Sequence, residues 1–282
     1  MRTCNDEETA ILAEVRDIKL STDKVLAHVT NRVGHVIFNN PERHNAVSLD
    51  MWDAVDTAFS ALSSDDSVRV VVLSGAGGKS FVSGADISKF DSERGSKEAV
   101  DHYNARVKMI YNLIENFAKP TIAMINGYCM GGGLNLAACT DFRIVSTKSQ
   151  FAMPAAKLGL GYPFEAVNRL INAVGLAEAK MLMFTAKTID ANTALRLGFV
   201  QESVPEDELE QRVMDVATMI ADNAPLTVAA MKYSALQASK PNPDGMDLTR
   251  CNEMVAACFG SDDYKEGRRA FMEKRKPNFA GK

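Results

Sequence analysis

The sequence lacks the patterns that mark several large classes of protein. Its formal net charge of −4 leaves no excess of basic groups that would attract nucleic acid. No apolar run approaches the roughly 18 residues needed to span a bilayer. The N-terminal stretch MRTCNDEETAILAEVRD has no apolar signal-peptide core and carries too many acidic residues for a transit peptide. We therefore expect a soluble, cytoplasmic protein that binds neither nucleic acid nor membrane.

Cysteine and histidine are sparse and form no ligand pattern. The cysteines are odd in number and widely spaced without a CxxC pair, and the histidines form no HExxH motif. We expect buried, reduced thiols, which favour a reducing compartment, and no metal site. The residues concerned are Cys4, Cys129, Cys139, Cys251, Cys258, His28, His35, His44 and His102.

With 46% hydrophobic and 24% charged residues in a chain of 282, there is ample material for a folded core. Residues 1–22 read as an N-terminal extension. A short helix is possible there, capped by Asn5 with Glu8 three residues later. Its apolar face would consist of Ile11, Leu12, Val15 and Ile18.

Alternating strand and helix patterns follow the extension. Residues 25–30 and 33–39 predict a hairpin around Asn31-Arg32, and Ser48 can cap a helix that runs to about Leu62. SVRVVVLSG, KPTIAMING and DFRIVS read as strands, with helices expected at about 99–117 and from the GGG segment onward. This order predicts an α/β core over residues 23–205, followed by a mainly helical region over residues 206–282.

Two loops stand at the carboxyl ends of predicted strands, where open α/β sheets bind ligands. They are SFVSGADI at residues 80–87 and INGYCMGGGLNLAACTDF at residues 125–142. Glycine lets each loop turn with free backbone N–H groups, and such donors suit a carbonyl oxygen that gains negative charge. Close packing or a tight turn is the alternative explanation for the GGG segment.

Together with NPERHNAVS, FAMPAAKLGL and the tail AFMEKRKPNF, these loops make the chain resemble the crotonase family of enoyl-CoA hydratases and isomerases from about Val25 to Gly281. The resemblance implies a repeated ββα spiral with a helical C-terminal region that assembles trimers, often paired as hexamers. It also implies an acyl-CoA substrate and no separate cofactor. The family holds the thioester oxygen with two backbone N–H groups, which match Ala85 and Gly132 here.

The sequence departs from the family's hydratases at the two positions that carry their glutamates. These positions are Asn135 and Ala155. Alanine exchanges no proton, and an amide is no base near neutral pH, so hydration by that pair of residues is not expected.

Three residues are candidates for the missing chemistry. Glu165 in GYPFEAV could supply a single acid/base, although a surface carboxylate favoured by the helix dipole is the alternative. Tyr162 could donate a hydrogen bond to the substrate or simply cover the pocket. Asn135 could orient water or a carbonyl, or could pack the loop.

Substrate contacts are implied by the same resemblance. Arg43 in the NPERHN loop (residues 40–45) matches a basic position of the family, and Lys274 or Lys276 matches that of the tail, where a solvated basic tail is the alternative. His44, also in the NPERHN loop, is expected to be a surface group. Asp86 and Asp141 are expected to be structural, and Phe271 to pack against the acyl chamber or a neighbouring subunit. The remaining expected contacts are Ser83, Ala85, Asp86, Ile87 and Gly132.

These observations leave several reactions open. Isomerisation needs one acid/base, decarboxylation of a malonyl-type thioester needs the oxyanion hole without a strong base, and hydration of an unusual substrate is a third possibility. A CoA-ester binding protein that has lost catalysis is the alternative from another class.

Overall fold

The computed structural model describes residues 15–89, 95–240 and 242–282. Its larger sheet has seven strands in the order β1-β2-β3-β4-β6-β8-β11. The first two pairings are antiparallel and the rest are parallel. The strands are β1 (Arg16–Ile18), β2 (Val25–Thr30), β3 (Val33–Phe38), β4 (Val70–Gly75), β6 (Thr121–Ile125), β8 (Phe142–Ser146) and β11 (Glu202–Val204).

A second sheet of four short strands has the order β10-β9-β7-β5. Strands β5, β7 and β9 are parallel, and β10 closes the edge antiparallel to β9. The strands are β5 (Ser80–Val82), β7 (Tyr128–Met130), β9 (Gln150–Ala152) and β10 (Ile189–Asp190).

Before α3 (Lys97–Glu115), α4 (Gly132–Ala138) and α5 (Phe164–Val174) the chain passes from the larger sheet to the smaller one, which confirms the predicted ββα repeat. Strands β4 and β5 precede α3, β6 and β7 precede α4, and β8 and β9 precede α5. Each repeat therefore brings a strand–helix junction of the small sheet to the same side of the molecule.

The central strands are continuous apolar runs because their side chains are buried on both faces of the sheet, as β4 shows. Val71 and Leu73 belong to the main core with α1 (Leu49–Ser64), whereas Val70 and Val72 pack against α8 (Leu209–Ala221) on the other face. Both faces of the parallel sheet are thus covered, as such sheets require.

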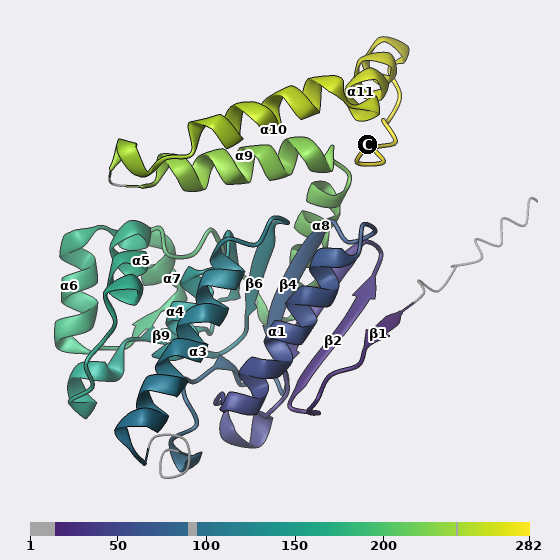
Figure 1. Ribbon diagram of the computed structural model, residues 1–282. Coiled ribbons are helices and arrows are strands. Elements are labelled where there is room, and N and C mark those ends of the chain that lie inside the picture. The colour runs from purple at the N-terminus through teal and green to yellow at the C-terminus, as the bar shows by residue number, and fades with distance from the viewer. Residues whose placement is uncertain (1–14, 90–94, 241) are drawn as a thin grey trace, which may run out of the picture.

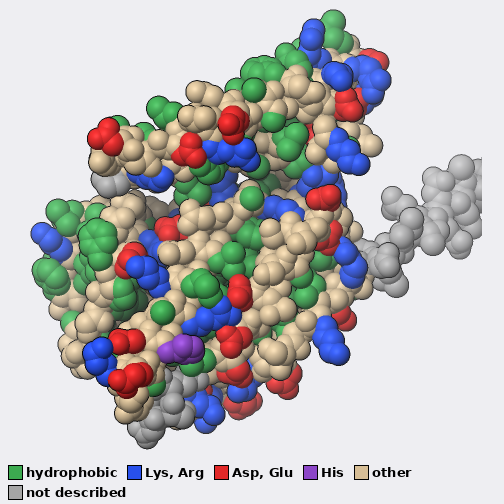
Figure 2. Space-filling model, in the orientation of Figure 1, with side chains coloured by type: hydrophobic (Ala, Val, Ile, Leu, Met, Phe, Trp, Pro, Cys, Tyr) green, Lys and Arg blue, Asp and Glu red, His purple; other side chains and the backbone are tan. Residues whose placement is uncertain are grey.

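The C-terminal helices form a separate layer beyond one end of the sheets, and α8 joins this layer to the core (Figure 1). Apolar side chains remain exposed along it: Phe271 is 84% and Phe259 is 63% exposed. Figure 2 shows hydrophobic side chains along these upper helices. The helices of this region and those before it are α6 (Leu176–Thr185), α7 (Ala191–Arg196), α9 (Pro225–Ala238), α10 (Leu248–Gly260) and α11 (Asp262–Glu273).

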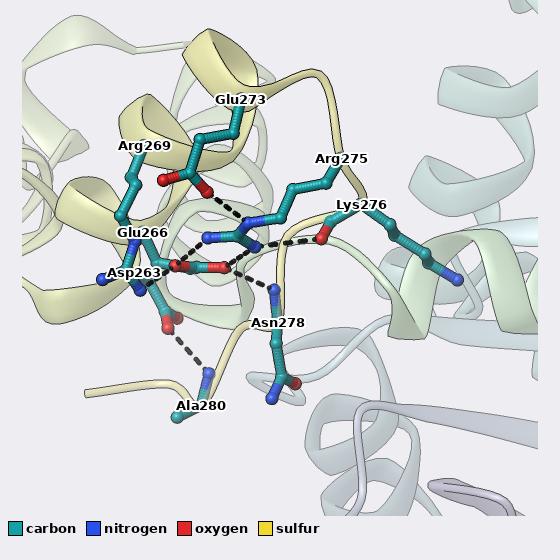
Figure 3. Close-up of polar contacts among 8 residues, drawn as sticks. All are labelled: Asp263, Glu266, Arg269, Glu273, Arg275, Lys276, Asn278 and Ala280. Atoms are coloured by element: carbon teal, nitrogen blue, oxygen red, sulfur yellow. Dashed lines mark hydrogen bonds and ion pairs between the residues drawn. The ribbon is translucent and has the colours of Figure 1, made fainter.

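Polar contacts hold the chain end against α11 (Figure 3). Glu266 accepts hydrogen bonds from Arg275 and from the Asn278 backbone, and the buried Asp263 accepts from the backbone N–H of Ala280 at 2.7 Å. The chain-terminal segment is therefore part of the folded layer.

Two predictions about local structure are corrected. The short helix expected to reach Ile18 is wrong in the part described, because Arg16–Ile18 form β1 and pair with the open edge of β2. Residues 1–14, with Asn5 and Ile11, lie outside the described residues. Cys129 and Cys139 are buried, but Cys251 and Cys258 are only partly buried, and Cys4 is not described.

The predicted hairpin is confirmed: Asn31 and Arg32 both have positive φ, which matches the right-handed twist of the paired strands. Within the described part of the chain, no helix is both long and apolar enough to cross a membrane. The boundaries proposed at residues 22 and 205 stay predictions.

Candidate active site

A cavity of about 300 Å³ opens where the two glycine loops meet α3 and α5. Its walls combine backbone from the loops with aromatic and aliphatic side chains. The residues that line it are Trp52, Ser83, Gly84, Ala85, Tyr103, Asn104, Val107, Lys108, Tyr111, Gly131, Gly132, Asn135, Pro154, Ala155, Leu158, Leu160, Gly161, Tyr162, Pro163, Glu165, Ala166 and Arg169.

The first loop presents the backbone N–H of Ala85. Val47 donates to the carbonyl of Gly84 at 2.9 Å and accepts from the N–H of Asp86 at 3.0 Å. Ala85 is the bridge residue between these two bonds, so its own N–H points away from Val47. Gly84 has a φ of +118°, which only glycine adopts without strain.

The second loop presents the backbone N–H of Gly132, the first residue of α4, a position whose N–H has no partner within the helix. A Cβ added to Gly132 would lie 3.8 Å from the Ala85 nitrogen. The two loops therefore bring the backbone N–H groups of Ala85 and Gly132 to one wall of the cavity.

Close packing, the alternative explanation for the GGG segment, applies to its last glycine. A Cβ on Gly133 would lie 2.0 Å from the carbonyl oxygen of Val82. Helix α4 therefore lies directly against β5, and this contact fixes the position of Gly132.

Two tyrosines hold the glycine segment in place. Tyr111 donates its hydroxyl to the carbonyl of Gly132 at 3.0 Å, and Tyr162 donates to that of Gly131 at 3.1 Å. Burial raises the pKa of both phenols, so they stay protonated near neutral pH. Tyr162 thus covers the pocket with its hydroxyl bonded to the loop.

Asn135 and Ala155, which match the two glutamate positions of the family's hydratases, both line this cavity, as the resemblance implies. Asn135 is 4% exposed, and no hydrogen-bond partner is present for its Oδ1 among the described residues. Glu165 is the one carboxylate among the described residues that line the cavity. The site therefore has little capacity for carboxylate acid/base chemistry.

Glu165 lies in the first turn of α5, with its Oε1 2.5 Å from the Nζ of Lys108 on α3. The hydrogen bond from Lys108 lowers the pKa of Glu165 below its ordinary value. The side chain is 38% exposed, which places the ion pair at the rim of the cavity. A proton donor or acceptor near neutral pH needs the opposite shift.

Arg43 and Asp86 lie together behind the first loop. Arg43 Nη1 donates to Ser88 at 2.7 Å and lies 3.6 Å from Asp86, whose carboxylate also accepts from the Ser88 backbone at 3.0 Å. Asp86 has the expected structural role. The remaining expected contacts fall on the same loop: Ser83 lines the cavity, and Ile87 begins the short helix η2 (Ile87–Lys89), although nothing is described of its side chain.

The tail lysines do not reach this cavity within the same chain. Lys276 forms an ion pair with Asp222 at the end of α8, with 2.5 Å between Nζ and Oδ2, and Lys274 ends α11. Figure 3 shows the side chain of Lys276 directed away from Glu266 and the residues that bind it. Phe271, expected at the acyl chamber or a neighbouring subunit, is likewise absent from the cavity wall.

Two elements of the site were not predicted. One is the contribution of α3, where Lys108, Tyr111 and Glu115 lie on one helical face; their spacing of three and four residues was the available signal. The other is Arg169, 7% exposed and bonded to Glu115 at 2.7 Å, which fastens α5 to α3 behind the cavity.

No cluster of three or more potential metal ligands occurs among the residues that the structure describes. Asp141, expected to be structural, accepts from the Thr121 backbone at 2.7 Å and from Lys232 at 2.7 Å. His44 is exposed and lies in the NPERHN loop (residues 40–45), outside the cavity wall.

Comparison with known proteins agrees with this architecture. Residues 28–282 match the family model for enoyl-CoA hydratase/isomerase. The chain is 34% identical over 264 residues to the crotonyl-CoA hydratase of Syntrophomonas wolfei, covering 93% of this chain and 100% of that protein. It is 32% identical over 254 residues to the methylmalonyl-CoA decarboxylase of Escherichia coli, covering 89% and 95%.

A solved structure from Magnetospirillum magneticum, described as an enoyl-CoA hydratase/carnithine racemase, superposes with a TM-score of 0.87 at 32% identity. The match covers 93% of this chain and 97% of that one.

Proposed function

The chain belongs to the enoyl-CoA hydratase/isomerase family, and from that premise we propose that it binds an acyl-CoA thioester and stabilises its enolate anion. The thioester oxygen takes hydrogen bonds from the N–H groups of Ala85 and Gly132. The observation that carries the proposal is the convergence of these two unpaired donors on the cavity wall. Such donors lower the barrier most where charge develops during the reaction.

The reaction that this site supports best is decarboxylation of a malonyl-type thioester. The bond between Cα and the carboxylate breaks, its electron pair moves into the thioester to give the enolate, and CO₂ leaves. Water then supplies the proton that Cα takes up. None of these steps needs a carboxylate at Asn135 or Ala155, and the similarity to a methylmalonyl-CoA decarboxylase supports the choice.

Double-bond isomerisation is the second candidate, because Glu165 is a carboxylate in the cavity wall. It would have to remove a proton from one carbon of the acyl chain and return it to another. The ion pair with Lys108 and the lowered pKa of Glu165 make it a weak base for that task.

Arg43 is the residue of this chain that we assign to the CoA phosphates, because its side chain is 56% exposed beside the loop at residues 80–87. Lys274 and Lys276 stay proposed contacts for the CoA phosphates, although neither lines the cavity of the same chain. The exposed apolar face of α9–α11 supports assembly as a trimer or a pair of trimers. A cytoplasmic location remains a prediction.

Turnover of the purified protein on methylmalonyl-CoA, a 3-enoyl-CoA and crotonyl-CoA tests the proposal. We expect CO₂ release from the first and no comparable hydration of the third. Isomerisation of the 3-enoyl-CoA would favour Glu165 chemistry instead. Tight binding of all three without turnover would identify a CoA-ester binding protein, and absence of binding would contradict the proposed function.

A further inference from the structure

The amide between Gly131 and Gly132 joins one proposed donor to a hydrogen-bonded carbonyl. The N–H of Gly132 and the carbonyl of Gly131 belong to this one planar group and point in opposite directions. The carbonyl oxygen accepts from the backbone N–H of Asn135 at 3.2 Å and from the hydroxyl of Tyr162 at 3.1 Å. The amide that presents its N–H to the cavity is therefore held at its carbonyl by two donors.

The other proposed donor has the same arrangement. The N–H of Ala85 shares its amide with the carbonyl of Gly84, which accepts from the backbone N–H of Val47 at 2.9 Å. Of the three donors that the described residues supply to these two carbonyls, two are backbone groups. The third is the side chain of Tyr162, so a conservative substitution can remove its hydrogen bond alone.

Tyr162 is fixed where its hydroxyl can keep this bond. The residue packs against the main hydrophobic core, lines the cavity and directly precedes Pro163 and helix α5. Burial raises the pKa of its phenol, so the hydroxyl keeps its proton near neutral pH. It therefore remains a neutral donor to Gly131 throughout the pH range in which the protein is folded and assayed.

A hydrogen bond accepted by a carbonyl makes the N–H of the same amide a better donor. The bond draws electron density towards the oxygen, and the amide hydrogen becomes more positive. Hydrogen bonds linked in this way strengthen one another by about 10–30% per bond. The effect matters most where the N–H faces an oxygen that gains negative charge during the reaction.

We propose that Tyr162 is a positioning residue: through the carbonyl of Gly131, its hydroxyl makes the N–H of Gly132 a stronger donor to the thioester oxygen. The inference rests on the proposed function, because it needs a thioester held by this N–H. Tyr111 provides the matched comparison. Its hydroxyl donates at 3.0 Å to the carbonyl of Gly132, which belongs to the next amide and shares it with the N–H of Gly133.

Infrared difference spectra of the full chain with bound butyryl-CoA, labelled with ¹³C at the thioester carbonyl, test this inference. Binding should move the carbonyl band to lower frequency. Tyr162→Phe should lose about 5–15% of that shift, since Gly132 supplies one of the two hydrogen bonds and that bond weakens by about 10–30%. Tyr111→Phe should keep the wild-type shift, although it too loses a hydrogen bond to the glycine segment. A merely structural role of the two hydroxyls predicts equal changes in both variants.

A graded variant tests the same point without removing the hydroxyl. Tyr162→3-fluorotyrosine has a more acidic phenol and is a stronger donor of nearly the same size, so it should increase the shift beyond that of the wild type. Isothermal titration with butyryl-CoA shows that the pocket is kept, because each variant should bind it within about threefold of the wild-type affinity.

The outcomes separate the two proposals. A wild-type shift in Tyr162→Phe, or an equal loss in Tyr162→Phe and Tyr111→Phe, overturns the inference and leaves Tyr162 as a cover of the pocket. If Tyr162→Phe fails to fold, Tyr162→3-fluorotyrosine decides, because a larger shift supports the inference and an unchanged one overturns it. A wild-type band that does not move on binding contradicts the proposed function itself, and the inference with it.

Discussion

Ala85 and Gly132 come from loops 47 positions apart in the sequence, and a Cβ on Gly132 would lie only 3.8 Å from the Ala85 nitrogen. A side chain there would also approach the Tyr111 hydroxyl to 3.2 Å. Glycine at this position therefore keeps the space between the two N–H groups open. This relationship underlies the proposed chemistry, because an oxygen atom needs that space to take both hydrogen bonds.

The ion pair between Glu165 and Lys108 leads to a prediction for Glu165→Gln. We expect turnover to change by less than about threefold, whereas loss of a general acid or base costs about 10²–10⁴ in rate. The pKa of Glu165 is lowered, so its carboxylate stays charged at every pH above the ordinary pKa of a glutamate. The pH–rate profile should therefore show no titration of Glu165 near neutrality. Steady-state assays from pH 5 to 9 check both points.

Lys108→Met is the companion variant, and it too should retain activity. A loss of about 10² or more in Glu165→Gln with unchanged thioester affinity would instead assign the proton transfer to Glu165 and favour isomerisation.

The absence of carboxylates at residues 135 and 155 predicts a gain of function. The double variant Asn135→Glu, Ala155→Glu should hydrate crotonyl-CoA at least about 10²-fold faster than the wild type, because it installs an acid/base pair in one cavity. Loss of the conjugated enoyl absorbance measures the rate. Each single variant serves as a control and should give little hydration. A double variant that binds butyryl-CoA yet hydrates nothing would show that these positions do not face the reacting carbons.

His35 makes stability depend on pH. Burial lowers its pKa to about 4, with a further contribution from His28, whose ring stacks on it at 4.6 Å. Between pH 6.5 and 4 the unfolded chain binds more protons at this residue than the folded one, so stability falls as the pH drops through that window. The effect amounts to at most about 3 kcal/mol.

Urea denaturation of wild type and His35→Gln at pH 7 and pH 5 measures this contribution. The wild type should lose more stability than the variant, and the exposed His102→Gln should behave like the wild type. Equal losses in wild type and His35→Gln would contradict the assignment.

The exposed face of the C-terminal layer predicts self-association. An apolar groove is lined by residues of α9, α10 and α11. Two of its lining residues are largely exposed: Phe271 is 84% and Met272 is 80% exposed. Phe271→Asp should shift the protein from a trimer or hexamer towards smaller species, because a charge cannot be buried there without a partner. Light scattering after size-exclusion chromatography measures the mass, and circular dichroism checks that the fold is kept. A monomeric wild type would contradict the expected assembly.

The sequence predicted the parts of the site that backbone chemistry defines. Gly84 and Gly132 stand in motifs whose turns are visible as glycine spacing. The alternation of apolar runs predicted an α/β core, and the ββα order came from the resemblance to the crotonase family. The helix through Arg269 was not assigned, because charged residues dominate that segment and its stability comes from contacts such as Arg275 with Glu266.

Side-chain pairing across elements was the part that the sequence could not supply. The distance of 2.5 Å between Glu165 and Lys108 depends on the packing of α5 against α3, which no local pattern encodes. The same is true of the free Oδ1 of Asn135, since its lack of a partner is a property of the assembled cavity.

The most direct test of the central claim is the infrared frequency of the thioester carbonyl in bound butyryl-CoA labelled with ¹³C at that carbon. If Ala85 and Gly132 both donate to the oxygen, the band shifts to lower frequency on binding. Gly84→Ala should reduce the shift, since its φ of +118° strains alanine and the new Cβ would lie 3.7 Å from the Gly132 nitrogen. Gly78→Ala, also at positive φ but outside the cavity, should leave it unchanged. A bound carbonyl that keeps the frequency of free butyryl-CoA in water would contradict the account.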